Sequence, residues 1–274
     1  MTSALSRRRS GDIRGSADRS LEPVLSPAVV KACQLLDVLA EGSTPLGLAN
    51  LSRQTGIPKS SAHSVLAALR TAGLVSRSSE TGDYMLGPWA LKLAQRFLEY
   101  GGLTTQFAEA GKRFADQSGE TCQLGRLDGD EVVYLAKVDG RRRVQLASRV
   151  GARLPASTTA LGKALLSMES DAQIERMYWG RDLPKLTPNS IASPSTLLAE
   201  IRRVRVEGVA YDRQEVAVGL VCVAVPLAAV GDMRLAISTS IPSNAATESR
   251  LSELAELLTA LAGSILGSEN RGGE

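Results

Sequence analysis

Few side chains in this sequence could perform nucleophilic or metal chemistry. The only histidine is His63, which excludes a metal site built from several histidines and leaves one position for Ser-His-Asp or Cys-His catalysis. The strongest nucleophile is Cys222, with Asp212 or Glu215 as its partner. Because no histidine stands near to activate the thiol, and a buried strand cysteine is usually inert, we expect no catalytic residue, no metal site and no cofactor. A hydrolase is the alternative, which a turnover screen would detect.

One short segment is similar to a phosphate-binding loop. Residues 160–164 read Ala-Leu-Gly-Lys-Ala, but Ser157 stands where the first Walker glycine belongs. Ala164 stands where a Ser or Thr would contact magnesium. We therefore reject a nucleotide-binding loop.

Composition indicates a protein with two domains in a reducing compartment. The chain has 274 residues, more than one core usually holds, with 43% hydrophobic and 22% charged residues. Its three cysteines are odd in number and far apart, and no apolar run reaches the roughly 18 residues of a membrane helix. We expect a cytoplasmic protein with no membrane contact.

Positive charge is concentrated at the front of the chain. The first hundred residues carry a net charge of +4 and the remainder −1. Residues 1–26 contain five arginines among Ser and Gly, with almost no apolar residues, which predicts a flexible basic arm. This arm is either a solvated tail or a segment that also touches DNA phosphates.

The elements that follow predict a DNA-binding domain at 27–87. Apolar residues recur at helical spacing from 27 to 41, with Cys33 among the expected core positions, and again at about 46–55 and 59–71. The turn at 56–58, Gly-Ile-Pro, joins the last two helices, and strands at 74–77 and 83–86 predict a wing. No aromatic residue precedes Tyr84, so duplex DNA is a better partner than a single strand.

The outward face of the helix at 59–71 is small, polar and basic. This face predicts direct contact with DNA. Residues expected near base edges are Lys59, Ser60, Ser61, His63 and Ser64, and those expected toward phosphates are Arg53, Arg70 and Arg77.

The rest of the chain predicts a linker helix and an α+β domain. Residues 88–101 form a helix with a stripe of Trp89, Leu93 and Phe97 that could pack against a second copy. Between 102 and 268, strands are expected at 121–127, 131–138, 144–147, 209–213, 220–226 and 233–240, and helices at 103–118, 160–167, 171–179, 195–207 and 245–266. They predict a central antiparallel sheet with one face to cover and room for a pocket, followed by a tail at 269–274.

Several segments together resemble the IclR family of transcription regulators. The resemblance runs from about 27 to 266 and covers nearly the whole chain. It is carried by 51–63, the helix-turn-helix, and more specifically by 153–155 with 159–164, 211–215 with 219–226, and 236–240.

The resemblance implies a winged helix-turn-helix, a linker helix and a GAF-like effector domain, assembled as a dimer or a dimer of dimers. The function implied is that of a regulator, not an enzyme, that binds a pseudo-palindromic operator and responds to a small organic molecule, a carboxylate or a hydroxylated metabolite. The effector pocket of the family falls here on Ala160, Leu161, Asp212, Leu220, Cys222, Ser238 and Ser240.

The sequence departs from the family pattern at four positions. Basic residues common in the recognition helix are replaced by Ser64 and Ala67, while Ser157 replaces a common histidine and Val221 a common basic residue. The first pair leaves open a sensor that binds a protein partner through a decayed helix-turn-helix. The second pair predicts a ligand that differs from those of well-known family members. The alternative is that the pocket residues have only a structural role.

Overall fold

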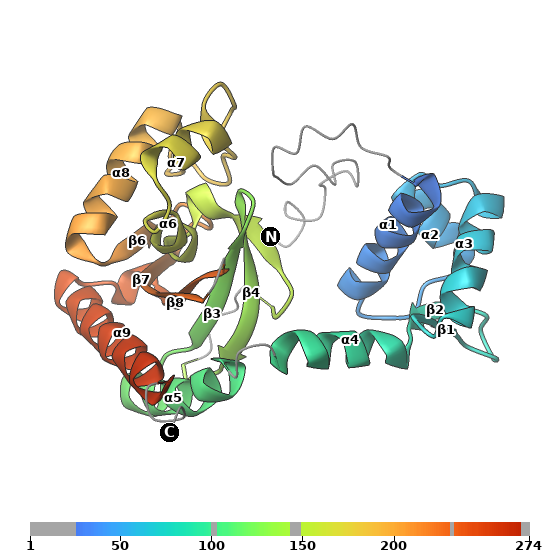
Figure 1. Cartoon of the computed structure of the whole chain (residues 1–274), viewed down its shortest axis with the longest axis horizontal. Helices are drawn as coiled ribbons and strands as arrows, with labels where there is room; N and C mark the ends of the chain where they lie inside the picture. Colours follow the sequence, from blue (N-terminus) through green and yellow to red (C-terminus); the bar gives the residue numbers. More distant parts are fainter. Residues whose placement is uncertain (1–25, 100–102, 143–148, 231–232, 270–274) are drawn as a thin grey trace. The chain divides into compact units, whose positions relative to one another are not determined.

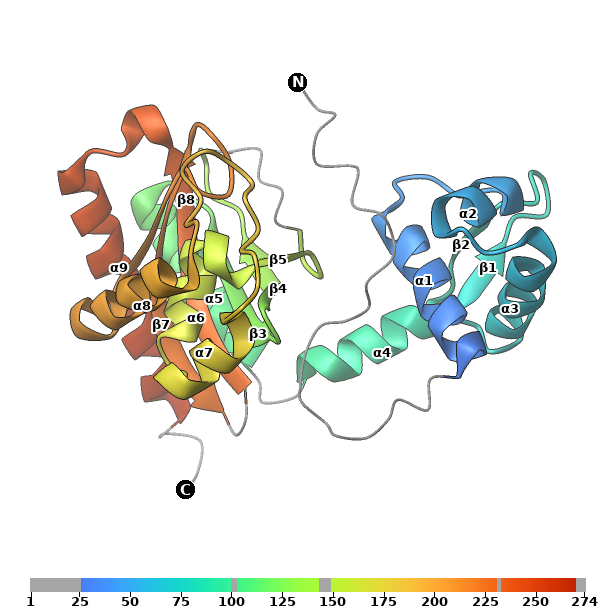
Figure 2. The same ribbon diagram turned by 90° about the horizontal axis from the view of Figure 1, so that it is seen from above.

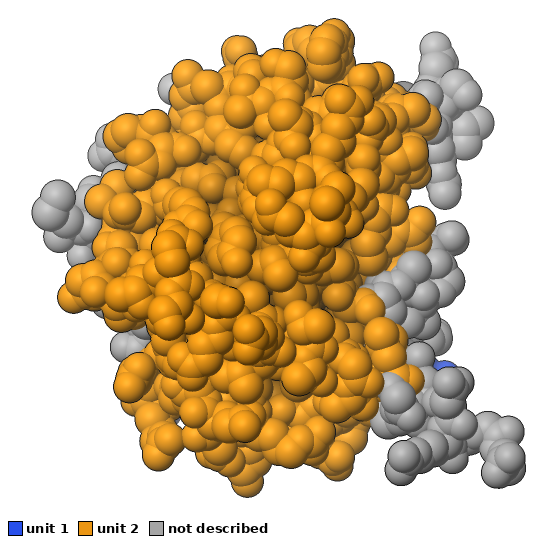
Figure 3. All heavy atoms as spheres, turned by 90° about the vertical axis from the view of Figure 1, so that its left-hand side faces the viewer, with its two compact units in different colours: residues 1–14, 18–100 blue, residues 15–17, 101–274 orange. Residues whose placement is uncertain are grey.

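The computed structural model of the chain describes residues 26–99, 103–142, 149–230 and 233–269. Within them, contacts separate two units, 26–99 and 103–269, shown from two directions in Figures 1 and 2. Figure 3 shows one face of the second unit as spheres. The basic arm up to residue 25, the tail from 270 and the strand predicted at 144–147 lie outside the described residues.

The first unit is a winged helix-turn-helix, as predicted. Its elements are α1 (Pro27–Glu41), α2 (Leu48–Thr55), α3 (Lys59–Thr71), the hairpin of β1 (Val75–Arg77) and β2 (Tyr84–Leu86), and α4 (Pro88–Glu99). Leu35, Leu51 and Leu66 are fully buried where the first three helices meet. Paired backbone hydrogen bonds of 2.9 Å between Leu46 and Tyr84 fasten the hairpin to the segment before α2.

Three predicted core positions on α1 are wrong. Cys33 and Ala40 are exposed, and Val29 is 61% exposed. Leu39 is buried and Leu36 lies at the edge of the core, as predicted, and Leu35, outside the predicted face, is fully buried. The buried stripe is therefore rotated around α1 from the predicted one, which carries Cys33 out of the core.

The second unit contains a six-stranded antiparallel sheet, which confirms the predicted fold class. Its strands are β3 (Cys122–Asp128), β4 (Glu131–Val138), β5 (Arg153–Pro155), β6 (Ala210–Arg213), β7 (Leu220–Val230) and β8 (Met233–Pro242), in the order β5-β4-β3-β8-β7-β6. The strand β5 was not predicted because three residues carry no readable alternation. The strand β7 runs past Pro226, where the register with β8 shifts and accommodates a residue without an N–H.

Helices cover both faces of this sheet, so the expectation of one face to cover is wrong. The helices are α5 (Leu103–Ser118), α6 (Ala160–Leu166), α7 (Asp171–Tyr178), α8 (Pro194–Glu207) and α9 (Glu248–Glu269), with 3-10 turns at Ala156–Thr158 and Ser243–Ala245. The helices α5 and α9 lie on one side of the sheet and α6, α7 and α8 on the other (Figure 1). Along β7, Val221, Val223 and Val225 pack in the cluster of α5 and α9, whereas Cys222 and Ala224 pack in the cluster of α6, α7 and α8.

The short helix α6 is buried along its whole length and is the element that shapes the inner face. Its N-cap is Thr159, whose hydroxyl accepts the N–H of Gly162 at 2.9 Å. The backbone of Ala156 passes so close to Gly162 that a Cβ there would lie 2.2 Å from the Ala156 carbonyl oxygen. Only glycine permits this approach.

We expect Gly162→Ala to destabilise the second unit by about 2 kcal/mol or more, because the added methyl would overlap backbone atoms that cannot swing away. The matched control is Gly263→Ala in α9, where a Cβ meets nothing within 4 Å. Its better helix propensity should add about 0.5–1 kcal/mol. Denaturant unfolding measures both, and equal stability of the two variants would contradict the tight packing of α6.

Candidate functional site

The outward face of α3 carries the residues that the sequence predicted for DNA contact. Lys59, Ser60, His63, Ser64 and Arg70 are exposed, and Ser61 is half-buried. Ala62, Leu66 and Leu69 on the opposite side hold the helix in the core. The amphipathic pattern thus leaves a continuous polar face available to a ligand as wide as a nucleic acid.

The turn before α3 is fixed by hydrogen bonds from small polar side chains. Gly56 adopts φ +72°, the left-handed conformation that glycine tolerates. The hydroxyl of Ser52 donates to the Ile57 carbonyl at 2.6 Å, and that of Thr55 donates to the Leu51 carbonyl at 2.7 Å. These contacts set the angle at which α3 leaves α2.

The three arginines predicted to contact phosphates are all exposed, but they differ in their contacts within the protein. Arg77 Nε donates to the Gly82 carbonyl at 2.8 Å, and its guanidinium lies 5.4 Å from the centre of the Tyr84 ring. Arg53 donates to Asn50 Oδ1 at 2.8 Å. Arg77 therefore also shapes the wing.

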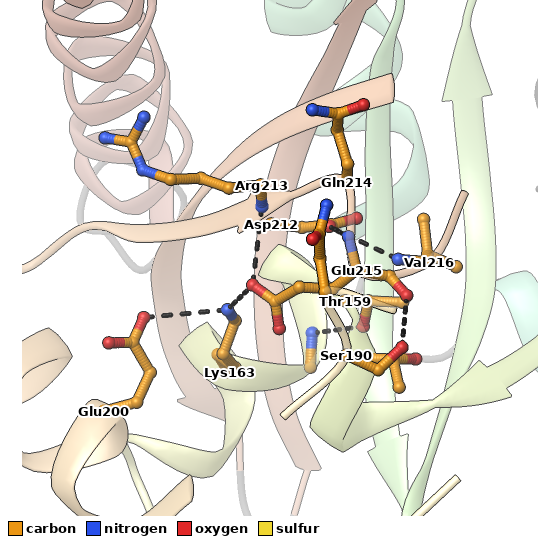
Figure 4. A network of polar contacts seen from close by, with 12 residues as sticks. Thr159, Lys163, Ser190, Glu200, Asp212, Arg213, Gln214, Glu215 and Val216 are labelled. Carbon is orange, nitrogen blue, oxygen red and sulfur yellow. Dashed lines mark hydrogen bonds and ion pairs between the residues drawn. The ribbon is translucent and has the colours of Figure 1, made fainter. Parts of the chain in front are cut away.

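The second unit contains a buried ion pair on α6, the helix that also carries the predicted pocket residues Ala160 and Leu161. Lys163 Nζ is 1% exposed and lies 2.5 Å from Glu215 Oε1 and 3.6 Å from Glu200 Oε1 (Figure 4). A buried ammonium is tolerated only when carboxylates and hydrogen bonds compensate it. Lys163 thus links α6 to α8 and to the loop after β6.

That loop is held by an unusual number of side-chain contacts to its backbone. Thr187 Oγ1 donates to the Gln214 carbonyl at 2.7 Å and Ser190 Oγ to the Glu215 carbonyl at 2.7 Å. Gln214 adopts φ +65°, and its side-chain oxygen accepts the N–H of Gly219 at 2.9 Å. The loop is fixed in a conformation that a non-glycine residue rarely adopts.

Asp212 lies between this loop and the sheet. Its Oδ1 accepts the backbone N–H of Glu215 at 2.5 Å and, more weakly, that of Val216 at 3.4 Å (Figure 4). Asp212 is opposite Cys222 in the β6–β7 register, and Cys222 is opposite Ser240 on β8. Ser240 Oγ donates to Cys222 Sγ at 3.1 Å. Three of the predicted pocket residues therefore lie in one row across the sheet.

The other predicted pocket residues lie on the same inner face. Ala160, Leu161 and Cys222 belong to one buried apolar cluster, and Leu220 packs at its edge. Ser238 faces Ala224 across the β7–β8 register, and its hydroxyl lies 3.4 Å from Gln123 Oε1 on β3. All seven are thus on the α6 side of the sheet.

Three buried oxygen atoms, in β6, in the loop after it and in the 3-10 turn before α6, have no hydrogen-bond partner within the described part of the chain. They are Asp212 Oδ2, Glu215 Oε2 and Ser157 Oγ. A buried acceptor without a partner costs about 1–3 kcal/mol, so such atoms call for a reason. Sequence reasoning did not include Lys163 and Glu200 among the candidate residues and named Glu215 only as a possible partner of Cys222, although a lysine among Ala and Leu on an apolar helix is a readable signal.

Burial controls the protonation of this row. It raises the pKa of Asp212 to about 6, although the Glu215 amide partly offsets the effect. Burial also raises the pKa of the Cys222 thiol, with a further contribution from the nearby Asp212 carboxylate. Burial, Cys222 and Asp212 together raise the pKa of Tyr134. The thiol is therefore protonated at neutral pH and is a poor nucleophile.

The described residues contain no cluster of three or more His, Cys, Asp or Glu that could bind a metal ion. No helix in those same ranges is long and apolar enough to span a membrane.

Comparison with known proteins identifies both units. Residues 28–79 match the IclR helix-turn-helix domain, and residues 96–266 match the C-terminal domain of the bacterial transcriptional regulator IclR. The HTH-type transcriptional regulator XynR of Escherichia coli is 34% identical over 203 residues, 73% of this chain and 79% of XynR. KdgR of Escherichia coli is 30% identical over 244 residues, 89% of this chain and 92% of KdgR.

A solved structure shares the fold at lower identity. An IclR homolog from Microbacterium hydrocarbonoxydans, complexed with 4-hydroxybenzoate, is 23% identical with a TM-score of 0.76, covering 87% of this chain and 97% of its own. With family matches over both units and relatives at 30% identity or more, the chain belongs to the IclR family of transcription regulators, with a DNA-binding N-terminal domain and an effector-binding C-terminal domain.

Proposed function

We propose that residues 27–87 read operator DNA, that 88–101 form a linker helix, and that 102–268 bind a hydroxyl-bearing organic effector. The observation that carries the effector site is the pair of buried carboxylate oxygens without partners, Asp212 Oδ2 and Glu215 Oε2, with Asp212 opposite Cys222 in the sheet register. The protein would act in the cytoplasm and catalyse no reaction, since Cys222, the nucleophile that a hydrolase would use here, is a buried and protonated thiol.

For DNA, we infer that α3 enters the major groove. Its exposed N-terminal half would place Lys59, Ser60, Ser61, His63 and Ser64 near base edges, with Arg53, Arg70 and Arg77 toward phosphates. Base contacts set the choice of sequence, whereas phosphate contacts set the dependence on salt.

Arg70→Ala should weaken binding to all duplexes alike and lower the slope of log affinity against log salt by about one, because one phosphate contact is lost. His63→Ala should instead change the ranking of operators with the salt slope kept. Arg77→Ala should resemble Arg70→Ala with an additional loss from the loosened wing. Titration of a selected operator and a scrambled duplex at several salt concentrations separates these effects. Uniform loss in the Arg70 and His63 variants alike would contradict the assignment.

For the effector, the chemistry of the unpaired atoms selects the ligand. Asp212 Oδ2 and Glu215 Oε2 are acceptors when ionised, so a ligand group facing them must donate a hydrogen bond. A bare carboxylate would be repelled there, whereas a hydroxyl satisfies Asp212 and leaves any carboxylate of the ligand to contact other groups. A hydroxylated carboxylate therefore fits better than its deoxy counterpart.

Calorimetric titration should show that hydroxylated carboxylates bind more tightly than their deoxy counterparts, with 4-hydroxybenzoate and benzoate as one pair in the panel. Because the hydroxyl donates to ionised Asp212, whose pKa is about 6, affinity should rise about tenfold between pH 5 and 7. Asp212→Asn should weaken binding and abolish the rise in affinity with pH. Ser240→Ala should weaken binding but keep that rise.

The matched control is Asp171→Asn, a carboxylate paired on the surface with Arg202 and Arg205. It should leave the affinity and its pH profile unchanged. If the ligand that shifts operator affinity binds Asp212→Asn as tightly as the wild type, the site lies elsewhere.

The working unit is proposed to be a dimer or a dimer of dimers on a pseudo-palindromic operator. On α4, Trp89 is 38% and Leu93 52% exposed, one turn apart on the same side. Phe97 follows Leu93 by four residues, the spacing of the stripe, and its side chain is not among those that the structure describes. One recognition helix covers few base pairs, so two half-sites are needed for specificity.

Leu93→Glu should shift the protein toward monomer in sedimentation at micromolar concentration, because a carboxylate in an apolar interface is costly. Leu91→Glu is the matched control, since Leu91 is 62% exposed on the opposite side of α4 and should leave assembly unchanged. A wild type that sediments as a monomer while binding operator tightly would refute the dimer.

A further inference from the structure

The centre of the exposed face of α3 carries only short side chains. These are Ser60, Ser64, Ala67 and Thr71, all exposed and spaced by four, three and four residues. They lie directly opposite the buried side of the helix, which Ala62, Leu66 and Leu69 define. The backbone of α3 can therefore approach a ligand closely along this stripe.

The longer polar side chains of α3 lie on one flank of the stripe. By their spacing, Lys59, His63 and Arg70 share one side of the helix, and α3 contains no Asn, Gln, Asp or Glu. Side chains that read a base pair through two hydrogen bonds are therefore missing from the centre of the face. Serine hydroxyls can donate or accept and so discriminate weakly between bases.

The C-terminal half of the stripe exposes methyl groups. Ala67 is exposed, and Thr71 Oγ1 donates to the Ala67 carbonyl at 3.1 Å, which leaves the threonine methyl as its free group. In the major groove, only thymine presents a methyl group, at C5. An alanine methyl on a closely approaching helix is a suitable contact for it.

We propose that Ala67 contacts the C5-methyl group of one thymine in each operator half-site and so determines the base preferred there. This inference rests on the proposed role of α3 as the base-reading helix. The serines nearer the start of α3 bind neighbouring base edges together with Lys59 and His63, and Arg70 lies toward the backbone of one strand.

The experiment begins with an operator obtained by selection from random duplexes with the purified full-length protein. Each thymine is then replaced singly by deoxyuridine, which removes the methyl and keeps the base pair. One thymine per half-site should show a loss of about fourfold in affinity, the size expected for one buried methyl group. In Ala67→Gly, the same replacement should have no effect.

The control is Ala68→Gly, which carries the same cost in helix propensity at an exposed position off the stripe and should keep the fourfold loss. Full sensitivity of Ala67→Gly to the replacement overturns the inference, as does a wild type that is insensitive at every thymine. If the wild type is insensitive while His63→Ala still changes the selected sequence, α3 reads bases and only the methyl contact is wrong. If neither has an effect, the assignment of α3 fails as well.

Discussion

The second unit is organised around one buried positive charge. Lys163 is 1% exposed on a helix that is otherwise apolar, and its ammonium must be paired because removing one partner of such a pair costs about 3–5 kcal/mol. Glu215 meets it at 2.5 Å from the loop after β6. The loop must therefore return over α6, and the left-handed Gln214, at a cost of about 1–2 kcal/mol, is the turn that brings Glu215 there.

In this arrangement one residue, Asp212, belongs both to the contacts that hold the loop and to the proposed effector site. Asp212 Oδ1 caps the amide of Glu215, while its Oδ2 has no partner among the described residues. A donor that binds Oδ2 must change the charge distribution on the carboxylate that holds the loop. Because Glu215 in turn pairs with Lys163, and Lys163 lies near Glu200 of α8, the proposed effector would change the balance of one connected polar network. A ligand that favours one state of that network by about 1–3 kcal/mol has the strength typical of allosteric effectors.

Sequence patterns predicted the elements far better than the details of the site. The winged helix-turn-helix and the antiparallel sheet followed from period and turn residues, and the inner-face row followed from the resemblance. Cys33 was misplaced because the apolar residues of α1 span more than half its circumference, so the pattern does not decide which third is buried. The pairing of Lys163 with Glu215 could not be predicted, since the two lie 52 positions apart and only the fold brings them together. Unpaired atoms such as Ser157 Oγ are equally invisible in a sequence, because they depend on what surrounds them.

The two proposed binding sites of this regulator differ in whether their polar groups are exposed or buried. On α3 the polar groups are exposed to solvent, so binding of DNA is favoured when its own polar groups form hydrogen bonds with them and when methyl groups are buried. Because the side chains are short, little side-chain entropy is lost on binding. On the inner face of the sheet the polar groups are buried and some have no partner among the described residues, so a ligand that donates to them removes a desolvation penalty. This arrangement favours high selectivity, because a ligand that lacks the donor leaves Asp212 Oδ2 without one and does not remove that penalty.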